Sequence, residues 1–313
     1  MDWNRLVCLS ALEGTLTRLL ILGGAGMLGH KLWQQLHREY ETWITLRADF
    51  AAYDRYRLFE ERRTIAGVDA DEFDNVVRAF DVSKPEVVVN AIGVVKQLPA
   101  ARDPIVSISI NSLFPHRLAT LCSAAGARLI HVGTDCVFSG QKGMYTEDDP
   151  PDADDLYGRS KCLGEVVESG HLTLRTSIIG REMNSRNGLV EWFLSNRGQR
   201  VKGFRRAIFS GLTTVAFADV VGTVIRNHPD LRGLYHVSSD PIDKYSLLEL
   251  MRTAFRAPVD IEPADDVTVD RSLDSTRFRR ATGWSPAPWT ESIQGMAIDP
   301  TPYERWHAGD SSG

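Results

Sequence analysis

Cysteine is scarce in this chain, and the spacing of the cysteines argues against a zinc site. Only four cysteines occur in 313 residues, and they form no C-x-x-C pair and no zinc-ligand spacing. We therefore expect no metal site. Free, buried thiols in a reducing compartment fit this usage better than disulfides, and they favour a cytoplasmic location. The four are Cys8, Cys122, Cys136 and Cys162.

Long apolar runs and an excess of basic charge are also missing. No stretch approaches the roughly 18 apolar residues of a membrane helix, and the apolar run Leu6–Leu12 is too short for a signal peptide. A formal net charge of −5 gives no basic surface for nucleic acid. Neither a membrane nor a nucleic acid is therefore an expected partner. The 43% hydrophobic and 25% charged residues are typical of a globular protein.

Glycines at three-residue spacing follow a short apolar run near the start of the chain. The run Leu19–Leu22 is typical of a buried parallel strand, and the segment Met27–Leu36 has the apolar period of a helix. Between them, Gly23, Gly26 and Gly29 give the spacing G-x-x-G-x-x-G. A strand, a glycine turn and a helix in this order predict a dinucleotide site with the pyrophosphate at the helix N-terminus. A glycine turn without a ligand is the alternative.

A phenol and an ammonium lie four residues apart at Tyr157 and Lys161. On a helix these positions share one face, one turn apart. A nearby positive charge favours the phenolate and lowers the pKa of the tyrosine, so the pair can move a proton to or from an alcohol or carbonyl oxygen. The alternative is a surface tyrosine with a solvated lysine.

Strands and helices alternate through the first half of the chain. This order predicts an α/β fold: a doubly wound parallel sheet with helices on both faces and a ligand crevice at the carboxyl ends of the strands. Gly23, Asp69, Ala91 and Thr134 all fall at or just beyond such ends. A helix is expected near Asp71–Phe80. The predicted strands are Leu19–Leu22, Trp43–Leu46, Thr64–Gly67, Val87–Asn90, Arg128–Val132 and His171–Leu174.

The chain divides into three parts by pattern. Residues 1–17 precede the first strand and are expected to form a leader. Residues 18–176 carry the alternating pattern and form the dinucleotide-binding domain. Residues 177–313 are less regular and are expected to be mainly a smaller substrate-binding portion, with a frayed polar tail from about Thr301.

Together these motifs resemble the extended short-chain dehydrogenase/reductase family. That family combines G-x-x-G-x-x-G near the N-terminus with a later Y-x-x-x-K. Val87–Gly93 is similar to its fourth strand and the turn that follows, and His131–Asp135 is similar to its fifth strand, which ends at the active-site Ser or Thr. Asn111 stands where the family often has an asparagine on the intervening helix.

A closer resemblance is to the dTDP-4-dehydrorhamnose reductase branch, which acts on nucleotide-linked keto-deoxysugars for polysaccharide biosynthesis. The chain departs from the branch at Cys136, where a Tyr is usual, and in the loop Gly93–Gln97, so the identity of the sugar stays open. Stretches with looser counterparts are Leu174–Ser177, Gly211–Thr214, Gly233–Ser238 and Arg271–Asp274. The matching stretches are Gly133–Gly140 (GTDCVFSG), Gly143–Glu147 (GMYTE) and Tyr157–Glu165 (YGRSKCLGE).

NADP is the expected cofactor, in preference to NAD. The second strand ends at Arg47, where NADP enzymes favour arginine, although Asp49 two positions later keeps NAD open. Asp69 follows the third strand, where the family places an Asp near the adenine, and the alternative for Asp69 is a helix N-cap. The other residues expected at the cofactor are Gly23, Gly26, Met27, Leu28, Gly29, Ala91, Ile92, Gly93, Asn111, Tyr157 and Lys161.

The resemblance implies a ketone reduction. Hydride from the nicotinamide reaches the ketone carbon, Tyr157 donates the proton, and Thr134 hydrogen-bonds the oxygen on which charge develops. Lys161 is expected to lower the pKa of Tyr157 and to hold the nicotinamide ribose, with Asn111 supporting it through a water. The residues expected at a nucleotide-diphosphate sugar are Lys96, Thr134, Asp135, Cys136, Asn187 and Arg205, with Arg206 as the alternative to Arg205.

Two other functions stay open. A nucleotide-sugar epimerase needs a further acid–base pair over the sugar ring, and Lys96, His131, Cys136 and His236 are available. A non-catalytic regulatory paralogue is the third reading, which the intact Thr134, Tyr157 and Lys161 oppose. Dehydration is disfavoured, because related dehydratases carry a Glu where this chain has Cys136. A homodimer is compatible with each reading.

Overall fold

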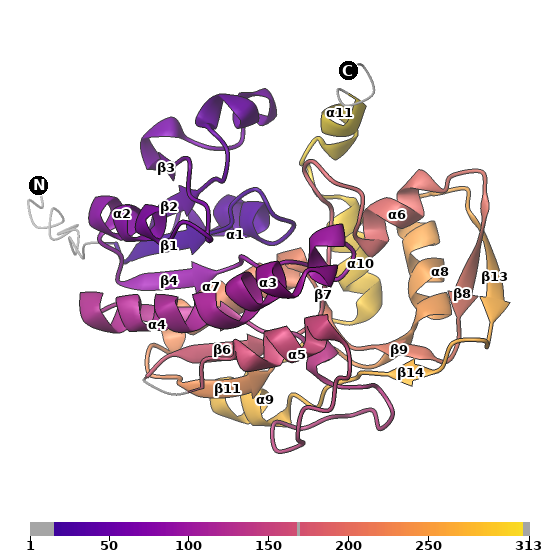
Figure 1. Cartoon of the computed structure of the whole chain (residues 1–313). Helices are drawn as coiled ribbons and strands as arrows, with labels where there is room; N and C mark the ends of the chain where they lie inside the picture. Colours follow the sequence, from indigo (N-terminus) through magenta and orange to yellow (C-terminus); the bar gives the residue numbers. More distant parts are fainter. Residues whose placement is uncertain (1–15, 168–169, 309–313) are drawn as a thin grey trace, which may run out of the picture.

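A parallel sheet forms the centre of the computed structural model, which describes residues 16–167 and 170–308 (Figure 1). In these ranges the sheet has seven strands in the order β11-β6-β5-β4-β1-β2-β3. The order reverses between β1 and β4, which is the switch point of a doubly wound fold. The predicted fold class is therefore confirmed. The strands are β1 (Arg18–Leu22), β2 (Glu41–Thr45), β3 (Thr64–Ile65), β4 (Val87–Asn90), β5 (Arg128–Val132), β6 (Leu172–Arg175) and β11 (Gly233–His236).

Helices cover both faces of this sheet, and the apolar run of β1 explains why. Successive side chains of a strand point to opposite faces, so Leu19 and Ile21 pack on one side while Leu20 and Leu22 pack on the other. All four are fully buried. The first side carries α1 (Gly29–Leu36) and α7 (Thr214–Asn227), and the second carries α2 (Phe73–Ser83) and α4 (Phe114–Ala125).

The predicted elements agree closely with these bounds. The fourth and fifth predicted strands have the observed limits, and the other four differ by one or two residues at their ends. The helix expected near Asp71–Phe80 begins at Phe73 and ends at Ser83. In the described residues no helix has the length and apolar character that a membrane crossing requires.

A second lobe is built from the C-terminal half around its own apolar cluster (Figure 1). Its main elements are α6 (Leu189–Ser195), β8 (Arg200–Phe204), α8 (Lys244–Ala254), β13 (Asp260–Ala264) and α10 (Trp289–Ala297). The short strands at its base are β7 (Ile178–Ile179), β9 (Ala207–Phe209), β10 (Leu212–Thr213), β12 (Ile242–Asp243) and β14 (Val269–Asp270). Three elements after residue 177 belong to the first lobe instead. β11 is a strand of the main sheet, α7 packs on that sheet, and α9 (Thr276–Thr282) packs beside β11. The division at residue 177 stays a prediction.

The C-terminal tail does not fray where the sequence predicted. Helix α11 (Tyr303–Ala308) follows Thr301, and Tyr303 and Trp306 are buried in an aromatic cluster with Tyr56. The hydroxyl of Tyr303 lies 2.7 Å from Nε2 of His30, on α1. The prediction of a frayed tail is wrong up to residue 308, because its two aromatic rings find apolar partners distant in sequence. The predicted leader lies almost wholly outside the described residues.

Candidate active site

The glycine turn brings the backbone of β1 close to the start of α1. Gly23 has a φ of +88°, a conformation that favours glycine. Its N–H lies 3.2 Å from Oγ1 of Thr45, and the N–H of Gly24 donates to the carbonyl of Thr45 at 2.9 Å. A Cβ on Gly29 would lie 2.0 Å from the carbonyl oxygen of Gly23. The third glycine is therefore required for close packing of helix on turn, as a dinucleotide fingerprint needs.

The turn after β4 lies directly against this glycine turn. A Cβ on Gly23 would stand 3.0 Å from Cγ1 of Ile92 and 3.1 Å from the carbonyl carbon of Ala91. The carboxamide of Asn90 accepts the N–H of Ile92 at 3.0 Å, which fixes the turn. The predicted cofactor residues of β1 and β4 therefore share one edge of the sheet, at its switch point.

Asn111 connects the β4 turn to the helix that carries Lys161. It lies in η4 (Ile108–Leu113), a π-helical turn between α3 (Pro104–Ser107) and α4. Its Oδ1 accepts the N–H of Val94 at 3.0 Å, and its Nδ2 donates to the carbonyl of Val94 at 3.2 Å. A Cβ on Gly93 would lie 3.3 Å from Asn111 Oδ1 and 3.8 Å from Lys161 Nζ. Asn111 thus lies next to Lys161, and π-turns are frequent at functional sites.

Tyr157 and Lys161 lie on one helix, α5 (Leu156–Leu163), as their spacing predicted. The carboxylate of Asp155 caps this helix by accepting the N–H of Gly158 at 2.8 Å. Nζ of Lys161 donates to the carbonyl of Val132, at the end of β5, at 3.1 Å. The ammonium is therefore held at the carboxyl end of the sheet.

The pKa values of the two groups correct one expectation. Burial raises the pKa of the Tyr157 phenol, and Cys136 and Asp135 act in the same direction while a hydrogen bond from Thr134 opposes them. Burial lowers the pKa of Lys161 to about 8. The prediction that Lys161 lowers the pKa of Tyr157 is wrong for this structure. The physical reason is that the phenol is desolvated while the ammonium donates to Val132.

Thr134 follows the end of β5 by two residues and lies beside Tyr157, with its hydroxyl in a small hydrogen-bonded turn. Its Oγ1 accepts the N–H of Cys136 at 3.2 Å and lies 3.3 Å from Oδ1 of Asp135. Burial raises the pKa of the Asp135 carboxyl, and it raises the pKa of the Cys136 thiol to about 12. A thiol of this kind stays protonated at neutral pH, so Cys136 is no nucleophile here.

Arg47 stands exposed just beyond β2, where a cofactor ribose would lie. Its side chain is 77% exposed, and its Nε lies 2.9 Å from Oδ2 of Asp69. Asp69 also accepts the N–H of Asp71 at 3.2 Å. Asp69 therefore has a local turn bond and an ion pair with Arg47, which brings the two predicted cofactor residues together. It does not cap the helix that follows, because α2 begins at Phe73 with Glu72 at its N-cap.

The predicted substrate residues are only partly brought together. Lys96 lies at the site, where Nζ is 2.6 Å from Oδ2 of Asp155. Asn187 is exposed next to Gly188, whose Cβ would lie 3.6 Å from Sδ of Met27 in the glycine turn. Arg205 is exposed after β8 and forms an ion pair with Asp265. A phosphate contact of Arg205 stays a prediction.

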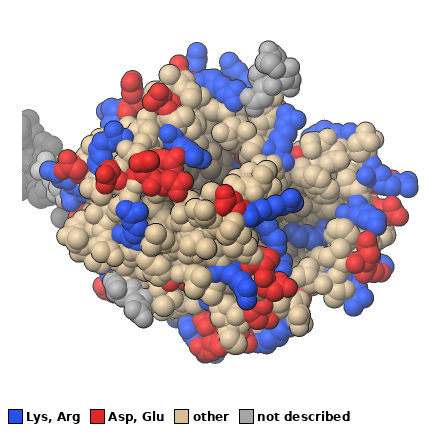
Figure 2. Space-filling view, viewed as in Figure 1, with Lys and Arg blue, Asp and Glu red and all other residues tan. Residues whose placement is uncertain are grey.

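Two cations near the Thr134 turn escaped the sequence analysis. Arg271 donates from Nε to the carbonyl of Phe138 at 2.7 Å, and its charge acts on Asp135. Lys244, the first residue of α8, also acts on Asp135 and Cys136. The R-S-L-D stretch was a signal for Arg271, but no motif marks Lys244. Figure 2 shows Lys and Arg atoms along the hollow between the sheet-bearing lobe and the second lobe.

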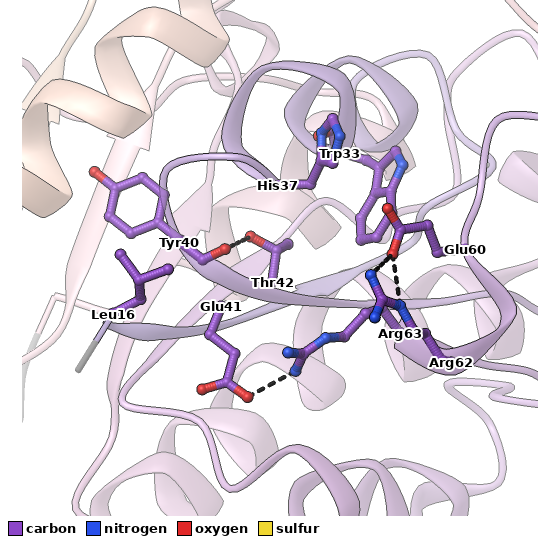
Figure 3. A pocket seen from close by; sticks show the side chains of 9 residues that line it. All are labelled: Leu16, Trp33, His37, Tyr40, Glu41, Thr42, Glu60, Arg62 and Arg63. Atoms are coloured by element: carbon purple, nitrogen blue, oxygen red, sulfur yellow. Dashed lines mark hydrogen bonds and ion pairs between the residues drawn. The ribbon is translucent and has the colours of Figure 1, made fainter.

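A separate cavity of about 400 Å³ lies near the amino end of β2 (Figure 3). Its two arginines already have partners, since Arg62 pairs with Glu60 at 3.0 Å and Arg63 with Glu41 at 2.7 Å. The predicted catalytic groups lie at the opposite, carboxyl edge of the sheet. This cavity is therefore distinct from the site of Thr134.

Comparison with known proteins places this geometry in a family. The family model described as RmlD substrate binding domain matches residues 17–299. The spore coat polysaccharide biosynthesis protein SpsK of Bacillus subtilis is 28% identical over 234 residues, 72% of this chain and 75% of that protein. The dTDP-4-dehydrorhamnose reductase of Aggregatibacter actinomycetemcomitans is 25% identical and covers 90% of this chain and 98% of its own.

Two further likenesses bear on function and fold. Methionine adenosyltransferase 2 subunit beta of Xenopus tropicalis is 25% identical, covering 88% of this chain and 80% of its own. A solved dTDP-4-dehydrorhamnose reductase from Bacillus anthracis, in complex with NADP, superposes with a TM-score of 0.75 at 19% identity, covering 91% of this chain and 99% of the other. This last likeness shows the fold.

Proposed function

The chain belongs to the RmlD substrate binding domain family, within the extended short-chain dehydrogenases/reductases, and from this premise we propose that it reduces the ketone of a nucleotide-linked keto-deoxysugar. Its relatives support an NAD(P)-dependent enzyme of nucleotide-sugar metabolism. The observation that carries the proposal is the convergence of Thr134, Tyr157 and Lys161 at the carboxyl end of β5, beside the glycine turn.

In this mechanism the nicotinamide cofactor supplies hydride when it is bound. Tyr157 donates its phenolic proton to the ketone oxygen, and the hydroxyl of Thr134 stabilises the charge that develops on that oxygen. Tyr157 carries its proton at neutral pH, because the ordinary pKa of a phenol near 10 is not lowered in this structure, and the proton is therefore available for transfer. Lys161, next to the turn at Gly93, is positioned to hold the nicotinamide ribose.

NADP is the cofactor that we propose, on the strength of Arg47. A guanidinium at the end of β2 can pair with a 2′-phosphate, and its exposed position leaves room for one. The glycine turn and the residues Ala91–Gly93 accept the rest of the dinucleotide. A relative solved with NADP supports the site but not the preference.

The test is turnover with defined substrates. Purified protein should oxidise NADPH in the presence of nucleotide-linked 4-keto-6-deoxy sugars, with the reduced sugar identified by NMR. Activity with dTDP-4-dehydrorhamnose and none with the dTDP sugar lacking a ketone is the expected pattern. No turnover on any keto sugar, by protein that binds NADPH, would contradict the proposal.

Epimerisation is less well supported by the geometry. His131 and His236 were possible acid–base groups, but both are fully buried. His131 Nδ1 lies 3.1 Å from Asn90, while His236 Nδ1 lies 3.0 Å from the carbonyl of Tyr145. The Cys136 thiol is protonated, and Lys96 is paired with Asp155. No sugar product should therefore appear without a stoichiometric loss of NADPH.

A regulatory role is the second candidate, favoured by the likeness to methionine adenosyltransferase 2 subunit beta. That likeness covers 88% of this chain, and the relative is named as a subunit of another enzyme. Under this reading the protein would bind NADP and change the kinetics of a partner enzyme without reducing any keto sugar. Turnover that disappears in the Tyr157→Phe variant would exclude it.

We further propose a homodimer. Neighbouring helices expose the large apolar side chains of Ile105 on α3, at 75%, and Leu163 on α5, at 67%. A second copy of this chain would cover them. Sedimentation of the wild type as a dimer, and of Ile105→Glu as a monomer, is expected.

A further inference from the structure

Lys244 lies where the second lobe meets the catalytic loop. It begins α8 directly after β12, which pairs with β9 so that Ile242 is opposite Phe209. Its ammonium stands 4.6 Å from the centroid of the Phe209 ring. Its charge acts on Asp135 and Cys136, which belong to the other lobe. The ammonium therefore faces the turn of Thr134 across the base of the hollow between the lobes.

Lys244 differs from Lys31, a buried lysine that the fold uses for structure. Lys31 is 4% exposed, and its ammonium lies 2.6 Å from Asp299. Lys244, by contrast, is only half-buried, and burial lowers the pKa of its ammonium. Among residues 16–167 and 170–308, however, no carboxylate forms an ion pair with it. The charge of Asp135 acts on the ammonium without a direct ion pair, so the ammonium can still take an anionic ligand.

The neighbouring cations already have protein partners. Arg271 donates to the carbonyl of Phe138 at 2.7 Å, and Lys96 pairs with Asp155 at 2.6 Å. The face of the Phe209 ring fixes the direction of the Lys244 ammonium, but a ring face accepts no hydrogen bond comparable to that of an anion. Lys244 is thus the cation at this turn with its donors still available.

We propose that Lys244 binds an anionic oxygen of the nucleotide-sugar substrate, close to the reacting sugar. This inference rests on the proposed function, because it assumes that a nucleotide sugar occupies the hollow. Nucleotide sugars carry anionic oxygens in two places: on the diphosphate of every one, and on a ring carboxylate of the uronates, which a 6-deoxy sugar lacks. The position beside Thr134 puts the anion within reach of the ring whose ketone Thr134 contacts.

Binding of four probes to the NADP-saturated protein tests the inference. Calorimetry with dTDP, UDP, UDP-glucose and UDP-glucuronate should be done on the wild type, Lys244→Met and Lys244→Arg. Methionine keeps the length and packing on Phe209 but removes the charge, whereas arginine keeps the charge. Lys202→Met is the matched control, because Lys202 is an exposed lysine of the same lobe paired with Asp266 at 3.0 Å.

We expect Lys244→Met to weaken binding of at least one probe about tenfold or more, as loss of a charge-assisted hydrogen bond should. Lys244→Arg should keep most of the affinity, and Lys202→Met all of it. Weakening of all four probes would assign the anion to the diphosphate, and weakening of UDP-glucuronate alone would assign it to a sugar carboxylate. NADP affinity and melting temperature should stay unchanged in either case.

Unchanged affinity of Lys244→Met for every probe that the wild type binds would overturn the inference. So would a lower melting temperature with unchanged affinity, which would mean that the lysine only packs on Phe209. A wild type that binds none of the four probes would contradict the proposed function itself, and with it this inference.

Discussion

At the scale of single residues, the sequence predicted some properties of the site and missed others. The spacing of Tyr157 and Lys161 predicted one helix face, which the structure confirms. It could not predict that burial would raise the pKa of the phenol, because burial depends on how α5 packs against η4 and the turn after β5. Lys244 has no motif at all, since only the pairing of β12 with β9 brings it to the site.

Replacing Tyr157 by Phe should abolish turnover and leave cofactor binding intact. The phenol is the proposed proton donor, and general acid catalysis contributes about 10²–10⁴-fold. Steady-state rates with NADPH and a keto sugar, beside NADPH affinity from fluorescence, measure both effects. More than about a tenth of the wild-type rate remaining would mean that another group donates the proton.

Arg47 should set the preference between the two nicotinamide cofactors. Arg47→Ala is expected to raise the Michaelis constant for NADPH about tenfold or more and to leave that for NADH nearly unchanged, because only NADPH carries the 2′-phosphate. Arg62→Ala is the control, since Arg62 is exposed but paired with Glu60 at the other edge of the sheet. Equal changes for both cofactors would show that Arg47 does not contact the phosphate.

At the scale of elements, the apolar strands were predictable and the shorter pieces were not. β4 and β5 have the predicted limits because both strands are apolar in the main and almost wholly buried on both faces. β11 was not predicted as a strand of the main sheet, since three of its four residues are only half-buried. α11 is six residues long, and burial of Tyr303 and Trp306 rather than helix propensity holds it.

The contact between α5 and the π-turn leads to a prediction at Gly164, which follows α5. A Cβ there would lie 1.8 Å from the carbonyl oxygen of Asn111, so Gly164→Ala must push the two elements apart. We expect a loss of about 1–3 kcal/mol in the free energy of unfolding and a reduced kcat, because Lys161 moves with α5. Urea unfolding and steady-state kinetics measure the two effects.

The control for this substitution is Gly295→Ala. Gly295 is exposed within α10, and a Cβ there meets nothing within 4 Å. Alanine is the better helix former, so this variant should gain about 0.5–1 kcal/mol. If Gly164→Ala behaves like Gly295→Ala, the close approach of α5 to Asn111 has no consequence for stability.

At the scale of the whole molecule, buried histidines tie distant parts of the chain together. His30 joins the glycine turn to the tail, with Nδ1 2.8 Å from the carbonyl of Gly26 and Nε2 2.7 Å from the hydroxyl of Tyr303. His236 joins β11 to β6 and the loop of Tyr145, with Nε2 3.2 Å from Arg175. Both side chains are fully buried, and burial lowers the pKa of each from 6.5 to about 4.

These two histidines should make the protein less stable in acid. The unfolded chain takes up protons on them below pH 6.5, whereas the folded protein does so only near pH 4, so the unfolded state binds more protons in this window and stability falls with falling pH. Between pH 7 and pH 5 each histidine should cost about 2 kcal/mol of unfolding free energy. Urea unfolding at both pH values measures the loss, and His30→Gln should show a smaller loss than the wild type. A pH dependence that His30→Gln leaves unchanged would mean that the acid sensitivity arises from other groups, and the link between glycine turn and tail would then play no part in it.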